Sequence, residues 1–182
     1  MKNLGWLAVT LALFIVTLVL TGWPAFKDLG HQREWKAVAA SSTEGELHGI
    51  QVGIREVKAA VVDNRPDRAL LFLRMELQGP QSAMESWTDC RASLQSASGE
   101  RWLPIEGYSI RAAIQILASD GKDNGNCSPA GVTGNAPATF DQIYRLPAGE
   151  LDNLTLKVSG YGTRPEALAF PIRPEVRRFP SP

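Results

Sequence analysis

The chain has 182 residues, of which 44% are hydrophobic, so it is neither disordered nor fibrous and has the length of one globular domain. Its 19 basic and 19 acidic residues give a formal net charge of zero. Because nucleic-acid binding depends on positive charge that neutralises phosphates, we expect no nucleic-acid partner.

The first predicted element is a membrane helix. Residues 4–26 contain no charged side chain, and a helix of about 20 residues is roughly 30 Å long, the thickness of a hydrocarbon core. Trp6 and Trp23 lie near its ends, where indole rings favour the membrane–water interface. A cleaved signal peptide is the alternative, but it has a shorter apolar core and ends in small residues, whereas bulky Trp23 lies just before Ala25. The sequence therefore predicts an uncleaved signal anchor over residues 1–26.

The orientation of this anchor depends on two opposed arguments. Only Lys2 precedes the apolar stretch, whereas Lys27, Arg33 and Lys36 follow it, and this distribution places the C-terminal side in the cytoplasm. A short N-terminal tail is the usual form of a signal anchor, however, and the cysteines favour export. We expect a single-pass protein of the cytoplasmic (inner) membrane with its C-terminal domain on the extracytoplasmic, periplasmic side.

Cys90 and Cys127 are the only cysteines. Two cysteines so far apart form neither a CxxC redox pair nor a zinc site of several thiolates. In an exported domain such a pair forms a disulfide, which the loop-closure account credits with about 4 kcal/mol. The alternative is two buried free thiols in a cytosolic domain.

Between the anchor and the domain, residues 27–45 are polar and rich in Ala and Ser, and we interpret them as a stalk. The folded domain is expected over residues 46–172. Its first strand alternates apolar and polar residues from Ile50 to Ile54, and a change of phase near Arg55–Glu56 indicates a bulge. A turn over residues 63–68 and a second, largely buried strand follow.

Later strands show the same two-residue period. Cys90, Ala92 and Leu94 share one phase, whereas Cys127 lies in a Gly/Asn-rich loop. Further strands are predicted over residues 140–147, 154–159 and 168–172. The segment from residue 109 to 118 fits both a strand and a helix, and Ser109 as N-cap with Gly121 as stop favours a short helix. Prolines in the Pro/Arg-rich tail, residues 173–182, argue that it is exposed and does not extend the sheet.

About seven short strands without a βαβ repeat indicate a mainly β protein, an antiparallel β-sandwich with one short helix. The runs DQIYRLP, LDNLTLKVSG and ALAFPI follow one another near the end of the domain. In these runs and in the order of its turns, the chain resembles the immunoglobulin-like domains of uncharacterised bacterial single-pass proteins. The resemblance covers residues 46–172, about 70% of the chain, and implies a fold and an envelope location but no functional residue.

No catalytic motif is present. His31 and His48 are the only histidines, and neither lies in a metalloprotease, hydrolase or nucleotide-binding motif. The loop from Asp120 to Asn126 has oxygen donors, but Lys122 occupies a ligand position of a calcium loop, so a turn is the better interpretation. We therefore expect no catalytic residues, no metal and no cofactor.

Local positive charge is the remaining candidate for partner binding. It is carried by five arginines interleaved with acidic residues: Arg65, Arg68, Arg74, Arg177 and Arg178. We expect a non-catalytic binding or assembly module that contacts another envelope or membrane protein. The alternative is an envelope hydrolase, or a ligand- or metal-binding protein, whose site forms only in the fold.

Overall fold

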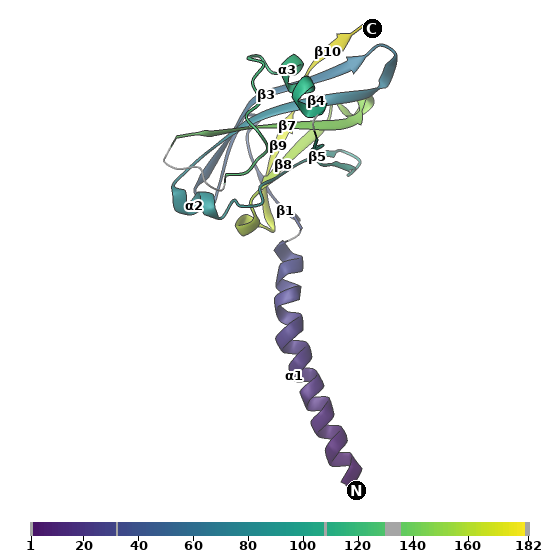
Figure 1. The fold of residues 1–182 in the computed structure, drawn as a ribbon, viewed down its shortest axis with the longest axis vertical. Helices are drawn as coiled ribbons and strands as arrows, with labels where there is room; N and C mark the ends of the chain where they lie inside the picture. Colours follow the sequence, from purple (N-terminus) through teal and green to yellow (C-terminus); the bar gives the residue numbers. More distant parts are fainter. Residues whose placement is uncertain (1, 32, 108, 130–135, 181–182) are drawn as a thin grey trace.

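Most of the N-terminal helix extends away from the rest of the molecule. The computed structural model describes residues 2–31, 33–107, 109–129 and 136–180. Helix α1 (Lys2–His31) projects from one end of a β domain, and the chain ends near the opposite end (Figure 1). Its apolar stretch Gly5–Trp23 is long enough to cross a membrane, a property that a signal sequence shares, and none of that stretch is buried against the domain.

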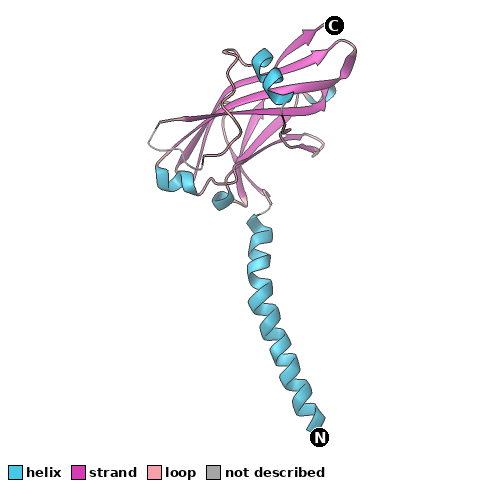
Figure 2. Cartoon of the chain, in the orientation of Figure 1, coloured by secondary structure: helices cyan, strands magenta, loops and turns pink. Residues whose placement is uncertain are grey.

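The domain consists of two β-sheets (Figure 2). Sheet A has the order β1 (Lys36–Ala39), β9 (Glu166–Ile172), β8 (Leu154–Ser159), β5 (Arg91–Ser96) and β6 (Arg101–Trp102). Sheet B has the order β10 (Glu175–Phe179), β3 (Ile50–Val62), β4 (Arg65–Gln78) and β7 (Ala138–Pro147), and β2 (Glu44–Leu47) also pairs with β3. The short elements are α2 (Gln81–Glu85), α3 (Ser109–Leu117), η1 (Ala148–Glu150) and η2 (Tyr161–Thr163).

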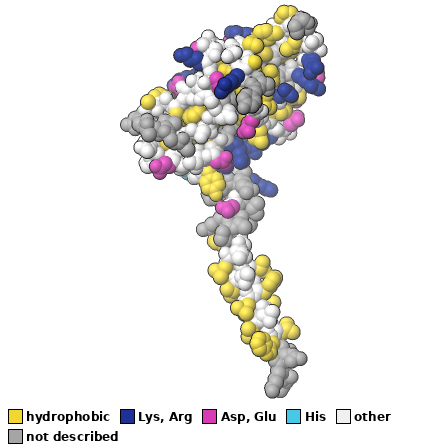
Figure 3. Space-filling view, viewed as in Figure 1, with side chains coloured by type: hydrophobic (Ala, Val, Ile, Leu, Met, Phe, Trp, Pro, Cys, Tyr) yellow, Lys and Arg dark blue, Asp and Glu magenta, His cyan; other side chains and the backbone are white. Residues whose placement is uncertain are grey.

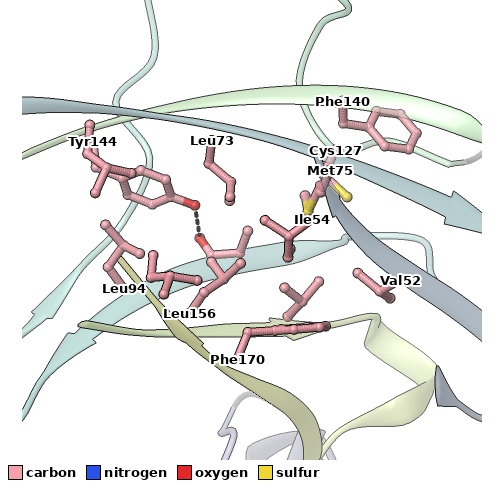
Figure 4. Packing of buried hydrophobic residues seen from close by; sticks show 14 of the residues in the cluster. Val52, Ile54, Leu73, Met75, Leu94, Cys127, Phe140, Tyr144, Leu156 and Phe170 are labelled. Atoms are coloured by element: carbon pink, nitrogen blue, oxygen red, sulfur yellow. Dashed lines mark hydrogen bonds between the residues drawn. The ribbon is translucent and has the colours of Figure 1, made fainter. Parts of the chain in front are cut away.

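The main core lies between the two sheets. Alternate residues of each strand point inward, so that apolar side chains of sheet B face those of sheet A (Figure 4): Leu73 and Met75 on one side, and Leu94, Leu156 and Phe170 on the other. The prediction of a mainly β domain is confirmed, as is the bulge, because the register between β3 and β4 shifts between Ile54 and Glu56.

A second, smaller core lies on the outer face of sheet B. Helix α3 packs Ile114 and Leu117 against Phe72 and Ile143, which are fully or almost fully buried. Strands β4 and β7 are therefore covered on both faces at this point, which explains why β4 is apolar in both phases. The preference for a helix over residues 109–118 is confirmed.

Two boundaries drawn from the sequence are wrong. Within the expected stalk, residues 36–39 form β1, which pairs in parallel with β9, and residues 44–47 form β2, which pairs with β3. Within the expected tail, β10 pairs in parallel with Lys58–Val62 of β3. The described residues thus form ten strands rather than about seven. All three extra strands lie at sheet edges with mostly exposed side chains, so they carry little of the apolar alternation that identifies a strand.

Candidate functional site

A cleft of about 780 Å³ opens between the two sheets at the edge of β3, and we call it the edge cleft. Its apolar wall is formed by Ile54 of β3, Leu154 of β8 and Ile172 of β9, all of which are buried. Polar groups surround this wall, among them the side chains of Thr43, Asn153, Thr155 and Arg173. The cleft therefore offers an apolar base and many hydrogen-bonding groups at its rim.

The pairing of β3 explains why the cleft is open. On one side β3 pairs with β4 along its length. On the other side β2 pairs with residues 50–53 and β10 pairs with residues 58–62. The amide of Ile54 still donates to the carbonyl oxygen of Thr43, at 2.7 Å, but residues 55–57 pair with neither strand. A short length of strand edge is therefore left between β2 and β10, at the bulge.

A smaller cavity of about 300 Å³ lies on the outer face of β2, β3 and β4. It is lined by Glu44, Glu46, Glu76 and Arg55, above Gly53. The Arg55 guanidinium donates to Glu76 at 2.6 Å, so part of this acidic charge is neutralised within the protein. Arg55 lines the edge cleft as well, and the two cavities adjoin at this residue.

Arg74, which was expected at a partner-binding surface, is buried. Its guanidinium donates to both carboxylate oxygens of Asp141, at 2.8 and 3.0 Å, and to Asp120 at 2.8 Å. Glu56 and the carbonyl oxygen of Lys122 are further acceptors. Its position on β4 gave no sign of this, because three of the acceptors come from the distant residues 120, 122 and 141. Arg74 is thus unavailable to a partner.

We call Arg74 with Asp120, Asp141 and Glu56 the Arg74 cluster, and hydrogen bonds shift the pKa of three of its members: Asp120, Glu56 and Arg74. The hydrogen bond from Arg74 lowers the pKa of the exposed Asp120 carboxyl. Burial alone would raise the pKa of Glu56, but hydrogen bonds from Lys58 and Ser119 outweigh it and hold that pKa below its ordinary value. Bonds to Asp141 and Asp120 raise the pKa of Arg74, whose charge is permanent. The ionised cluster ties the loop after α3 to sheet B.

The other predicted arginines are exposed. Arg65 and Arg68 lie within the first four residues of β4. On β10, Arg177 and Arg178 pair with Ala60 and Val61 of β3. These positions lie towards the end of the domain that is remote from α1, where Figure 3 shows basic side chains on the surface. Arg177 contacts Glu175 and Arg68 approaches Asp67, at 3.0 and 3.6 Å. This arginine set, without Arg74, remains a candidate surface for an acidic partner.

The other candidates from the sequence are the histidines and the calcium-like loop from Asp120 to Asn126. His48 lies in the exposed turn between β2 and β3, with its Nε2 atom 3.0 Å from the Glu166 carboxylate, and it lines neither of the two cavities above. Hydrogen bonds from Lys36 and His48 lower the pKa of Glu166. The side chain of His31 lies outside those described. Among the residues that the structure describes, no group of three or more His, Cys, Asp or Glu residues is arranged to hold a metal.

Cys90 and Cys127 form a disulfide, as predicted. Cys90 directly precedes β5, and Cys127 lies in the loop after α3. The bond therefore fastens that loop to the start of a sheet A strand, while the Arg74 cluster fastens the same loop to sheet B.

Sequence reasoning also missed a buried polar cluster at the junction between α1 and the domain. The carboxylate of Glu34, only 1% exposed, accepts hydrogen bonds from Ser159 and Arg101. Arg164 donates to Ser159 at 3.2 Å and to the Asp89 carboxylate at 2.8 Å. We call these residues the junction cluster. A polar residue in a polar segment gives no periodic signal, so the sequence did not reveal that Glu34 is buried.

Comparison with known proteins gives one distant similarity. No protein-family model and no curated protein matches the chain. Among solved structures, the chain is similar to a putative lipoprotein from Staphylococcus aureus subsp. aureus NCTC 8325, with 14% identity and a TM-score of 0.43. The match covers 72% of this chain and 90% of the other. What the geometry defines is a two-sheet β domain with an edge cleft, preceded by an apolar helix.

Proposed function

We propose that the protein is a membrane-anchored, non-catalytic binding module with an immunoglobulin-like sandwich on the extracytoplasmic side of the inner membrane. Its edge cleft would take an extended segment of a neighbouring envelope protein. The observation that carries this proposal is the length of β3 edge at residues 55–57, left between β2 and β10 and facing a cavity of about 780 Å³.

The chemistry of the cleft suits a peptide. An extended segment laid along an open strand edge gains backbone hydrogen bonds, and its alternate side chains enter the adjoining cavity. Ile54, Leu154 and Ile172 supply an apolar surface for one or two such side chains. The rim has both signs of charge, from Arg173, Asp152 and Glu175, and favours polar hydrogen bonding over a strongly charged ligand.

Two features support the location. The apolar helix Gly5–Trp23 supports an anchor, and the disulfide between Cys90 and Cys127 supports an oxidising compartment. Protease added to spheroplasts tests the topology. Digestion of the C-terminal domain is expected, and protection of that domain while an external control is digested would contradict the orientation.

Photocrosslinking in cells tests the peptide site. A photoreactive amino acid at Asn153, on the rim of the cleft, should give a crosslink to one protein of the envelope. The same amino acid at Arg111 on α3, which is exposed on the other side of sheet B, should not.

A pair of matched variants makes the result specific. Thr155 lines the cleft and Thr139 lies on β7 outside it, and both are half-buried strand residues. Thr155→Trp should fill the cleft and remove the Asn153 crosslink, whereas Thr139→Trp should leave it. If both variants keep the crosslink, the partner does not occupy the cleft. Equal crosslinking from Arg111 would also contradict the proposal.

A further inference from the structure

A separate cavity of about 370 Å³ lies against sheet A where α1 leads into the domain, and we call it the junction cavity. Its lining includes Arg33 and Trp35 from the segment after α1, Ser93 from β5, Arg101 from β6 and Lys157 from β8. The chain thus passes from its apolar helix directly to a basic, hydrogen-bonding cavity.

The cavity has an excess of positive charge. Glu34 is its one acidic lining residue, and the carboxylate of Glu34 is already engaged by Arg101 and Ser159. Within the described part of the chain, Arg33 and Lys157 form no ion pair. Arg33 is exposed and Lys157 is half-buried, so both charges are accessible to a ligand.

The cavity lies close to the level at which a membrane surface would be. The uncharged stretch ends at Phe26, and α1 ends five residues later at His31, a rise of about 7.5 Å. The headgroup layer on each side of a bilayer is about 5–7 Å thick. The domain also contacts α1 closer to the apolar stretch than His31 is, because the Tyr161 hydroxyl lies 3.4 Å from the Asp28 carboxylate. Arginine and lysine side chains extend readily towards headgroups.

Trp35 fits the same environment. Its side chain is 65% exposed although it is large and apolar, and indole rings are enriched at the membrane–water interface. An exposed tryptophan beside the accessible basic groups Arg33 and Lys157 is an arrangement that suits a lipid surface better than open solvent.

We propose that the junction cavity binds the phosphate headgroup of an anionic phospholipid through Arg33 and Lys157, with Trp35 at the interface. This inference requires α1 to remain in the membrane, as the proposed function does, but it is independent of the edge cleft and its partner. It gives the domain a second attachment to the bilayer.

Native mass spectrometry of the full chain tests this site. The purified protein in detergent is titrated with phosphatidylglycerol and, separately, with phosphatidylcholine, which has the same chains but no net charge. Wild type should retain one phosphatidylglycerol in preference to phosphatidylcholine. Each basic group near a lipid surface contributes about fivefold in affinity, so Arg33→Gln with Lys157→Gln should weaken phosphatidylglycerol binding by about 30-fold.

The control removes the same charge elsewhere. Arg65→Gln with Arg68→Gln lies at the far end of the domain and should leave lipid binding unchanged, while Arg33→Lys with Lys157→Arg should retain it. Equal loss in both glutamine variants would show general charge attraction and overturn the proposal, as would wild-type binding without headgroup preference. The intact mass reports whether residues before Arg33 are still attached, so loss of the anchor is distinguished from failure of the site.

Discussion

The hydroxyl of Tyr144 on β7 donates a hydrogen bond to the carbonyl oxygen of Ala92 on β5, at 3.2 Å, and so joins sheet B to sheet A through the core (Figure 4). Tyr144 is completely buried and Ala92 is 2% exposed. Because burial disfavours the phenolate, it raises the pKa of Tyr144 above its ordinary value of about 10.

This link gives the domain a sensitivity to alkali. A pKa that is raised in the folded state contributes stability that is complete below pH 10, and that contribution is lost as the pH rises further. Wild type should lose up to about 1.4 kcal/mol per pH unit above pH 10 from this group. Tyr144→Phe should cost about 0.5–1.5 kcal/mol at pH 7 but should lose less at pH 11. Urea unfolding at pH 7 and at pH 11 measures these free energies, with Tyr161→Phe as a control at an exposed tyrosine. An equal loss of stability between the two pH values in wild type and in Tyr144→Phe would contradict the prediction.

Arg74→Met should destabilise the domain by about 3–5 kcal/mol, because it leaves the buried carboxylate of Asp141 without its cationic partner. Arg68→Met, an exposed change on the same strand, should stay within about 0.5 kcal/mol of wild type. The double variant Arg74→Met with Asp141→Leu should recover part of the loss, since no unpaired charge remains. Chemical unfolding gives all three values, and a double variant less stable than Arg74→Met would show that the charge is not the cause.

Acid should weaken the attachment of the loop after α3. The pKa values of Asp120 and Glu56 are lowered in the folded protein, so their contributions are present above about pH 4 and disappear as the pH falls through the lowered values. Unfolding midpoints between pH 6 and pH 2.5 should therefore fall less steeply in Asp120→Asn than in wild type. Asp67→Asn, at an exposed turn, should keep the wild-type slope. An unchanged slope in Asp120→Asn would show that Asp120 does not contribute.

Cys90→Ser and Cys127→Ser should each cost about 2–4 kcal/mol, and the double variant should cost no more than either alone. The reason is that both changes remove the same bond. Reductant should destabilise wild type by a similar amount and leave the variants unaffected. Additive losses, or unfolding that does not respond to reductant, would mean that the cysteines act as separate packing residues.

Ending the chain after Arg173 should expose the edge of β3 without unfolding the domain. β10 supplies backbone partners to Lys58–Val62, but among its described residues only Phe179 packs against a core. We expect faster amide exchange at residues 58–62 and greater self-association, because an uncovered strand edge pairs with other chains. Arg177→Gln with Arg178→Gln keeps the strand and should change neither. Unaltered exchange in the shortened chain would contradict the role of β10.

What the sequence predicted depends on burial. The strands β3, β8 and β9 have one face against the main core, so their apolar residues recur largely at every second position and their existence was predictable. Pro174 and Pro180 argue against a strand in the tail, but they flank the five residues of β10 instead of interrupting them. Edge strands with exposed side chains leave no such pattern.

The candidate sites were less predictable than the fold. The edge cleft exists because β2 ends and β10 begins at particular points along β3, and both pairings join residues whose sequence shows no complementarity. The cavity beside α1 likewise joins Arg33 to Lys157, which are remote in the chain. The disulfide was predictable because only one pairing exists for two cysteines.

The burial of Glu34 determines how freely the domain turns on its helix. Glu34 follows α1 by three positions and is held by Ser159 and Arg101, so the chain is fastened to the domain within three residues of the end of the helix. For a chain inserted through α1, we expect this attachment to confine the mouth of the edge cleft to a narrow range of heights above the bilayer. If the proposed function holds, lateral diffusion in the membrane would then bring to the cleft mainly those neighbours whose exposed segments lie at a similar height.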